Sequence, residues 1–123
     1  MSKTLRVIVV EPHKVPRVEE IDAGLESLQG MVGGYIECIY PFEDQVGLVC
    51  NEEGKLQGLP LNRCLMHEGE VYDIIAGTFL IVGLSSDDFR SLTDKEAEEY
   101  IDMFFIPQKF VKMNEKIMVI PDC

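Results

Sequence analysis

YDIIAGTFLIVGL, residues 72–84, is the most apolar stretch of this 123-residue chain. Its β-branched and aromatic residues predict a strand that is buried on both faces, although Gly77 and Gly83 interrupt it. The stretch is far shorter than the roughly 20 apolar residues that a membrane-spanning helix needs. We therefore expect it to be a core strand of a globular domain.

Upstream of this stretch, residues 4–11 predict a second central strand because they are rich in valine and isoleucine. Residues 15–21 predict its neighbour, and Pro16 places that strand at a sheet edge. We expect Asp22 to be the N-cap of a first helix, where its carboxylate accepts the free N–H groups of the first turn. The glycine pair at 33–34 is expected to end this helix, because glycine adopts the left-handed conformation without steric cost.

The remaining segments predict hairpins and one further helix. Residues 35–41 and 46–50 form the first hairpin, and Asn114-Glu115 is expected to turn another between residues 110–113 and 116–120. Thr93 and Glu96 have the spacing of a capping box, which predicts the start of a second helix. The order ββα, ββ, long loop, β, α, ββ predicts a single α+β domain over residues 1–123. Its sheet should be mostly antiparallel, with two helices packed on it.

The charge and the cysteine pattern limit the function classes. The net charge of −11 repels nucleic acid and anionic membranes, so we expect neither as a direct partner. Glu11-Pro12 follows a short apolar run at once, so we expect a strand rather than a signal peptide there, and a cytoplasmic protein. The four cysteines form no metal-binding spacing with the two histidines, so we expect reduced thiols, no metal and no cofactor. Cys123 at the end of the chain favours adventitious disulfide dimers, and homo-oligomerisation stays open.

Residues 51–63, NEEGKLQGLPLNR, are interpreted as a long loop, and such loops are often functional. Glycine lets backbone N–H groups approach a ligand, and arginine presents a rigid fork that suits a phosphate. The predicted ligand-binding residues are Asn51, Gly54, Lys55, Gly58, Asn62 and Arg63. The alternative is a structural loop in which Arg63 pairs with one of the 22 acidic residues.

Two other features point to a protein partner. Asp94, Glu98 and Asp102 recur at every fourth position of the second helix, which predicts a row of carboxylates resembling the phosphates of a DNA strand. The alternative is an ordinary solvated helix face. Phe42, at the tip of the first hairpin, is expected either to fold back onto the core or to contact a partner. No nucleophile motif or convergent carboxylate pair is present, so we expect no enzymatic activity and no catalytic residue.

The segments LESLQGMVGGYIE, CNEEGKLQGLPLNR and DIIAGTFLIVGL occur in an order that resembles a family of small acidic proteins. That family occurs in Firmicutes, their phages and conjugative elements, and is known only as a domain of unknown function. The resemblance implies no activity and no catalytic residue. It implies a genetic setting in which accessory proteins often counter host defences.

The sequence therefore predicts a non-enzymatic accessory protein of a phage or mobile element, with a possible role against host defence. Its predicted activity is to bind and sequester a small phosphorylated ligand, such as a signalling nucleotide, at residues 51–63. The alternative is an acidic, DNA-mimic-like inhibitor that docks on a host nucleic-acid-binding or defence protein. In that case Asp94, Glu98, Asp102 and Phe42 would make the contacts.

Overall fold

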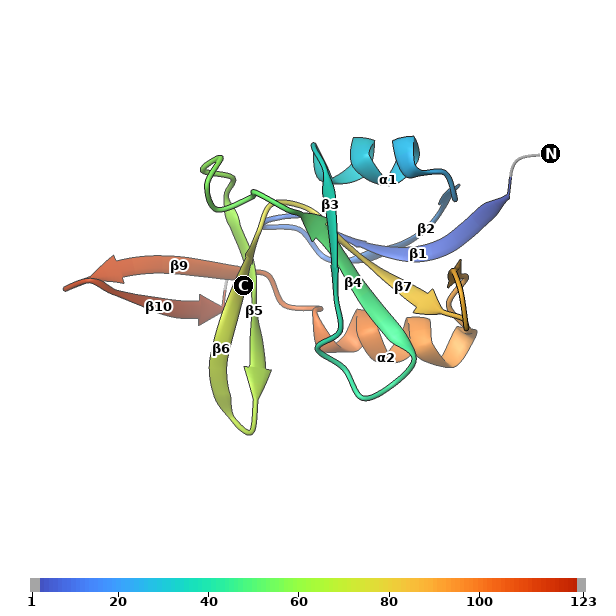
Figure 1. The fold of residues 1–123 in the computed structure, drawn as a ribbon. Helices are drawn as coiled ribbons and strands as arrows, with labels where there is room; N and C mark the ends of the chain where they lie inside the picture. Colours follow the sequence, from blue (N-terminus) through green and yellow to red (C-terminus); the bar gives the residue numbers. More distant parts are fainter. Residues whose placement is uncertain (1–2, 122–123) are drawn as a thin grey trace.

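A twisted antiparallel sheet runs through the centre of the computed structural model, which describes residues 3–121 (Figure 1). Its strand order is β2–β1–β7–β4–β3, and β8 pairs with β7 outside this path. The strands are β1 (Thr4–Val10), β2 (Arg17–Asp22), β3 (Ile36–Ile39), β4 (Val46–Asn51), β7 (Phe79–Leu84) and β8 (Phe89–Arg90). As predicted from Pro16, β2 lies at an edge of the sheet.

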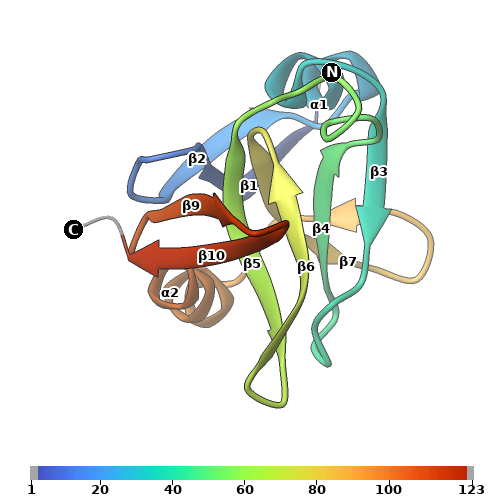
Figure 2. The same ribbon diagram turned by 90° about the vertical axis from the view of Figure 1, so that its left-hand side faces the viewer.

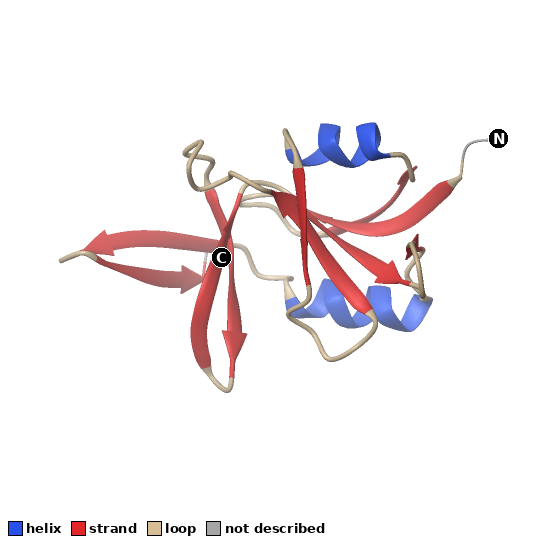
Figure 3. Ribbon diagram, in the orientation of Figure 1, coloured by secondary structure: helices blue, strands red, loops and turns tan. Residues whose placement is uncertain are grey.

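The two helices cover opposite faces of this sheet, α1 (Leu25–Val32) on one side and α2 (Asp94–Met103) on the other (Figures 1 and 3). Alternate residues of a strand point to opposite faces. In β1, Val7 and Val9 accordingly join the core cluster that contains α1, whereas Ile8 and Val10 join the cluster with α2. Each face of the central strands thus has its own core, and the predicted α+β class is confirmed.

The capping box of α2 forms as the sequence predicts. Thr93 Oγ1 accepts a hydrogen bond from the Glu96 backbone N–H at 3.2 Å, and the Thr93 N–H donates to Glu96 Oε1 at 2.9 Å. Arg90 donates to both carboxylate oxygens of Glu96, at 2.8 and 2.9 Å. The hydrogen bonds from Arg90 lower the pKa of Glu96 to about 2.

The N-cap assigned to Asp22 is wrong, whereas the predicted end of α1 is confirmed. Asp22 is the last residue of β2, and Gly24 is the N-cap of α1, with no side-chain cap. The carboxylate of Asp22 instead accepts the N–H of Gly24 at 2.8 Å, which turns the chain from the strand into the helix. Gly33 follows the helix with a left-handed φ of 79° and donates its N–H to Gln29.

Residues 72–84 are two strands and not one. β6 (Glu70–Ala76) pairs with β5 (Leu61–His67), whereas β7 belongs to the central sheet. Gly77 separates them because its φ of 82° is left-handed, and its N–H donates to Pro60 at 2.7 Å. The predicted burial on both faces holds for β7 and not for β6, whose first half is exposed.

Two hairpins lie outside the central sheet. One is β5–β6, and the other is β9 (Gln108–Met113) with β10 (Lys116–Pro121), turned at Asn114-Glu115 as predicted. The β9–β10 hairpin projects from the body of the molecule (Figure 1), and Figure 2 shows that it crosses the β5–β6 hairpin. Within residues 3–121, neither helix has the length and apolarity required to span a membrane.

Candidate functional site

The predicted loop at 51–63 is shorter in the structure. The chain leaves β4 at Asn51, turns through residues 52–60 and enters β5 at Leu61. Asn62 and Arg63 are therefore strand residues, and the prediction that they belong to a loop is wrong. Their side chains point into the interior, where they donate hydrogen bonds to backbone carbonyl groups of other elements.

Arg63 is a buried connector between three parts of the chain. Its side chain is 1% exposed. Nε donates to the carbonyl of Phe104 at 3.1 Å, Nη2 to the carbonyl of Lys14 at 2.7 Å, and Nη1 to Asn62 Oδ1 at 2.9 Å. No acidic side chain in the described part of the chain forms an ion pair with it, so the predicted alternative of an Arg63–acid pair is also wrong. Burial lowers the pKa of the Arg63 guanidinium.

The two asparagines of this segment also serve the fold. Asn62 is fully buried, and its Nδ2 donates to the carbonyls of Val10 at 2.8 Å and Gly77 at 2.9 Å. Asn51 Nδ2 donates to Val32 at 3.2 Å, at the end of α1. Asn62 thus joins the β5–β6 hairpin to the central sheet, and Asn51 joins that sheet to α1.

The other three predicted ligand-binding residues lie in surroundings that do not favour an anion. Lys55 pairs with Asp73 at 2.7 Å. Gly54 lies against β6, where a Cβ atom would be 2.7 Å from the carbonyl oxygen of Ala76, and Gly58 lies in the turn with a φ of 71°. Asn51, Gly54 and Lys55 do line one cavity of about 150 Å³. Four acidic residues share that cavity and repel a phosphate: Glu37, Glu52, Glu53 and Asp73.

The three acids of the predicted row on α2, Asp94, Glu98 and Asp102, are all exposed. Asp94 also forms an ion pair with Arg6 at 2.7 Å. Phe105 is half-exposed, because the helix ends at Met103. Glu98 and Asp102 flank an open groove that includes Ile101 and Phe105.

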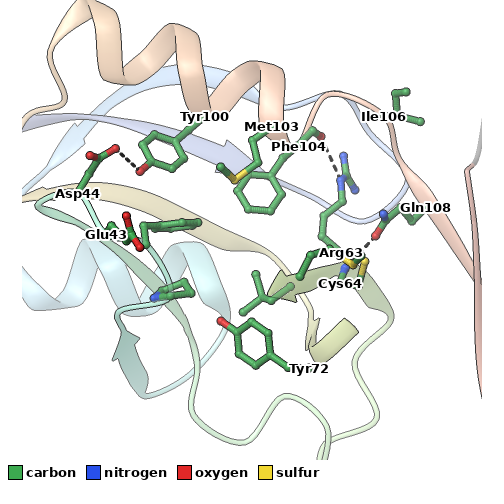
Figure 4. A pocket seen from close by; sticks show the side chains of 14 residues that line it. Glu43, Asp44, Arg63, Cys64, Tyr72, Tyr100, Met103, Phe104, Ile106 and Gln108 are labelled. Carbon is green, nitrogen blue, oxygen red and sulfur yellow. Dashed lines mark hydrogen bonds between the residues drawn. The ribbon is translucent and has the colours of Figure 1, made fainter. Parts of the chain in front are cut away.

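Another cavity, of about 500 Å³, lies between the β3–β4 turn, the β5–β6 hairpin and the end of α2 (Figure 4). Its floor is aromatic. The rings of Phe42 and Tyr100 are 4.7 Å apart, and those of Phe42 and Phe104 are 6.3 Å apart. Of the two alternatives for Phe42, the structure shows packing onto the core, and the same side chain lines the cavity.

The rim of this cavity combines apolar and acidic side chains. Four large apolar residues of the rim are more than half exposed: Met66, Tyr72, Met103 and Ile106. Glu43 and Asp44 are exposed on the turn beside Tyr100. Tyr100 donates its hydroxyl to Asp44 Oδ2 at 3.0 Å. Burial and the Asp44 carboxylate both raise the pKa of Tyr100, so the phenol stays neutral and acts as a donor.

Sequence reasoning found only Phe42 and Arg63 among the residues that line this cavity. The others come from four separate segments and follow no common spacing. The turn PFED was the one local signal, because it places an aromatic ring next to two carboxylates.

No observed arrangement favours catalysis. Groups of three or more metal-ligating side chains are absent from residues 3–121. Burial raises the pKa of the Cys50 thiol to about 11 and also raises that of Cys38, so neither is an activated nucleophile. Cys64 is a free, buried thiol, and Cys123 lies outside the described residues.

Comparison with known proteins places the chain in a family and gives no activity. No curated protein and no solved structure matches it. Residues 5–105 match the model of a domain of unknown function, DUF3846, which covers both helices and the whole central sheet. The β9–β10 hairpin lies beyond the matched segment. On this match, the chain belongs to the DUF3846 family.

Proposed function

We propose that this protein is a non-enzymatic docking protein, and that the cavity of Figure 4 binds a basic, partly apolar segment of a partner protein. The observation that carries the proposal is the combination of an aromatic floor, four exposed apolar side chains and two carboxylates around one cavity of about 500 Å³. Exposed apolar clusters of this kind mark interaction sites. A role for a phage or mobile element against host defence stays a prediction.

The electrostatics favour a cationic ligand. Glu43 and Asp44 supply negative charge at the cavity, and the chain as a whole carries −11. Arg63 is the one cationic residue of the lining, and its guanidinium is already bound to three parts of the chain. A lysine or arginine of a partner therefore meets carboxylates and aromatic rings, which attract cations by charge and by the ring quadrupole.

The apolar rim favours protein side chains over a free small ion. Methionine is flexible and polarizable, so Met66 and Met103 can adapt to side chains of different shape. Tyr72 adds a rigid aromatic surface of the kind that contributes most at protein interfaces. An apolar side chain next to a basic one would fill the cavity and reach Glu43 or Asp44 together.

The predicted capture of a small phosphorylated ligand has weaker support. Its cations are already committed, Lys55 to Asp73 and Arg63 to backbone carbonyls. The small cavity beside Lys55 is lined by acids. The alternative predicted from the sequence, an acidic protein that docks on another protein, is therefore the one we carry forward.

A titration followed by amide chemical shifts tests the proposal directly. The probes are two capped peptides of equal length, Leu-Arg-Phe-Arg-Leu and Leu-Glu-Phe-Glu-Leu. We expect saturable shifts at residues 42–44, 72 and 100–106 with the arginine peptide and none with the glutamate peptide. Shifts spread evenly over the acidic surface, without saturation, would show non-specific attraction and contradict a built site.

Two matched variants distinguish binding at the cavity from attraction to the net negative charge of the protein. Glu43→Lys reverses a charge beside the cavity, and Glu26→Lys makes the same change on the first turn of α1. We expect Glu43→Lys to weaken binding of the arginine peptide by about tenfold or more, which corresponds to roughly 1.4 kcal/mol. Glu26→Lys should leave it within about twofold, since exposed distant charges are screened beyond about 10 Å. Equal losses in both variants would overturn the proposal.

A further inference from the structure

The β9–β10 hairpin has two different faces. Residues directly opposite each other in an antiparallel pair point to the same side. The register of this hairpin therefore defines an inner face of Gln108, Phe110, Lys112, Ile117, Val119 and Pro121. The outer face consists of Lys109, Val111, Met113, Lys116, Met118 and Ile120.

The inner face is fixed to the body of the protein. Gln108 Oε1 accepts the backbone N–H of Cys64 in β5 at 2.8 Å. Phe110 and Val119, which are opposite each other on this face, are both partly buried. The orientation of the hairpin is thus set, and its other side is turned outward.

The outer face is apolar where a solvated face would be polar. A sheet with one solvated side normally alternates apolar and polar residues, with the polar ones outward. Here Val111, Met113, Met118 and Ile120 are all on the outer face and are 39–54% exposed. An isolated two-stranded hairpin is marginally stable in water, so burial of this patch would contribute to its stability.

The hairpin also differs from the body in charge. Residues 1–105 contain 20 acidic and eight basic residues, a net charge of −12. Residues 108–121 contain three lysines and Glu115, a net charge of +2. Lys116 belongs to the outer face. The surface that this face fits is therefore apolar and acidic.

The α2 groove has this character. Its apolar part consists of Val18, Ala97, Ile101 and Phe105, of which Val18 and Phe105 are about half exposed. Its charged residues are Lys95, Glu98, Glu99 and Asp102, all exposed, with a net charge of −2. The ten residues of α2 extend about 15 Å, and the six-residue strands of the hairpin extend about 20 Å, so the two surfaces match in length.

We propose that the outer face of the β9–β10 hairpin docks in the α2 groove of a second copy of this chain. Contact between two outer faces would bring lysines together, whereas the α2 groove supplies Glu98 and Asp102. One hairpin face is smaller than a standard interface of about 1,200–2,000 Å². The dimer is therefore reciprocal, with each copy giving its hairpin and receiving the other's, as two-fold symmetry allows.

Sedimentation velocity of the whole chain in reducing buffer tests this dimer. We expect the wild type to shift from 13.9 kDa towards twice that mass as its concentration rises. Lys116→Glu should move the equilibrium at least about tenfold towards monomer, because it places two acids together at each contact. Lys112→Glu is the matched control, because it makes the same charge change on the inner face of the same hairpin.

A charge exchange identifies the acceptor surface. Glu98→Lys in the α2 groove should also weaken self-association. An equimolar mixture of the Lys116→Glu and Glu98→Lys proteins should associate again. In the mixed dimer, the hairpin of the first protein and the groove of the second have exchanged charges, and the other hairpin and groove are both wild type. Restored association of the mixture would support the reciprocal dimer, since neither variant regains it alone.

The following outcomes would contradict the proposed dimer. A wild type that stays at 13.9 kDa up to the highest soluble concentration would overturn the dimer. Association that Lys116→Glu leaves unchanged, or that Lys112→Glu weakens as much, would show that the outer face is not the contact. Residues of the α2 groove do not line the cavity of Figure 4, so the peptide titration and the dimer can succeed or fail separately.

Discussion

At the residue scale, Arg63 shows how a side chain suited to ligand binding can serve the fold instead. Its guanidinium links β5 to the end of α2 through Phe104 and to the β1–β2 turn through Lys14. Backbone carbonyls and Asn62 take the place of a carboxylate. A buried cation with these partners holds three elements in register, and its removal leaves buried acceptors without donors.

Arg63→Ala should therefore destabilise the fold, contrary to the expectation from a loop residue. We expect a loss of about 2 to 4 kcal/mol in the free energy of unfolding, because two carbonyls of other elements lose charged donors. Lys55→Ala removes an exposed ion pair with Asp73 and should cost less than about 1 kcal/mol. Urea denaturation followed by circular dichroism measures both. Equal stabilities of the two variants would contradict the connector role.

Cys50 should react slowly with thiol reagents in the native protein. Burial raises its pKa to about 11 from an ordinary value of 9.0, which lowers the thiolate fraction at pH 8 by about 100-fold. Alkylation by iodoacetamide, located by peptide mass spectrometry, measures the rate. The same residue in protein unfolded by urea is the control. Native and unfolded rates within about threefold of each other would show that the thiol is accessible and ionised.

At the scale of single elements, local signals predicted best. The capping box of α2 and the left-handed glycine after α1 depend on residues within one turn, so their sequence patterns were sufficient. The prediction that Asp22 is an N-cap was wrong because this residue lies between two elements, and the strand extends to it before the helix begins. The apolar run 72–84 was predicted as one strand because the same residue types suit both β6 and β7. Only Gly77 marks the point where the chain passes from one sheet to the other.

The candidate site was less predictable than the fold for a related reason. The cavity of Figure 4 is assembled from segments that contact each other only after the hairpins fold back. The sequence indicated acidic character and the exposed turn at Phe42. It did not indicate that Tyr72 and Met103 share a rim, because pairs so far apart in sequence follow no periodicity.

The Arg90–Glu96 pair should make the stability of α2 depend on acid pH. The pKa of Glu96 is lowered to about 2 in the folded state, against 4.5 ordinarily. Its contribution is therefore complete above about pH 4.5 and is lost as the pH falls towards 2. Glu96→Gln should cost about 1 to 3 kcal/mol at pH 7 and progressively less below pH 4. Urea denaturation of both proteins across this range measures the difference, and a difference independent of pH would contradict the assignment.

At the scale of the whole molecule, stability should be unevenly distributed. β1, β4 and β7 are buried between two helices, whereas β9 and β10 contact the body on one face only. In dilute protein, we expect amide hydrogens of the central strands to exchange slowest and those of the β9–β10 hairpin fastest, because local opening of the hairpin exposes little core. Hydrogen exchange with mass spectrometry measures this order. Similar protection in both regions at low concentration would contradict it.

The pairing of β1 with β7 also has a consequence for synthesis of the chain. Val10 in β1 lies opposite Phe79, so the partner of this strand follows 69 positions later. At roughly 5 to 20 residues per second, a ribosome needs about 3 to 14 s to deliver it. During that interval the nascent strand has one edge paired with β2 and the other edge open. Frequent initiation at high expression would thus place many open edges of the same valine-rich strand near each other, and slower elongation would lengthen the time for which each edge stays open.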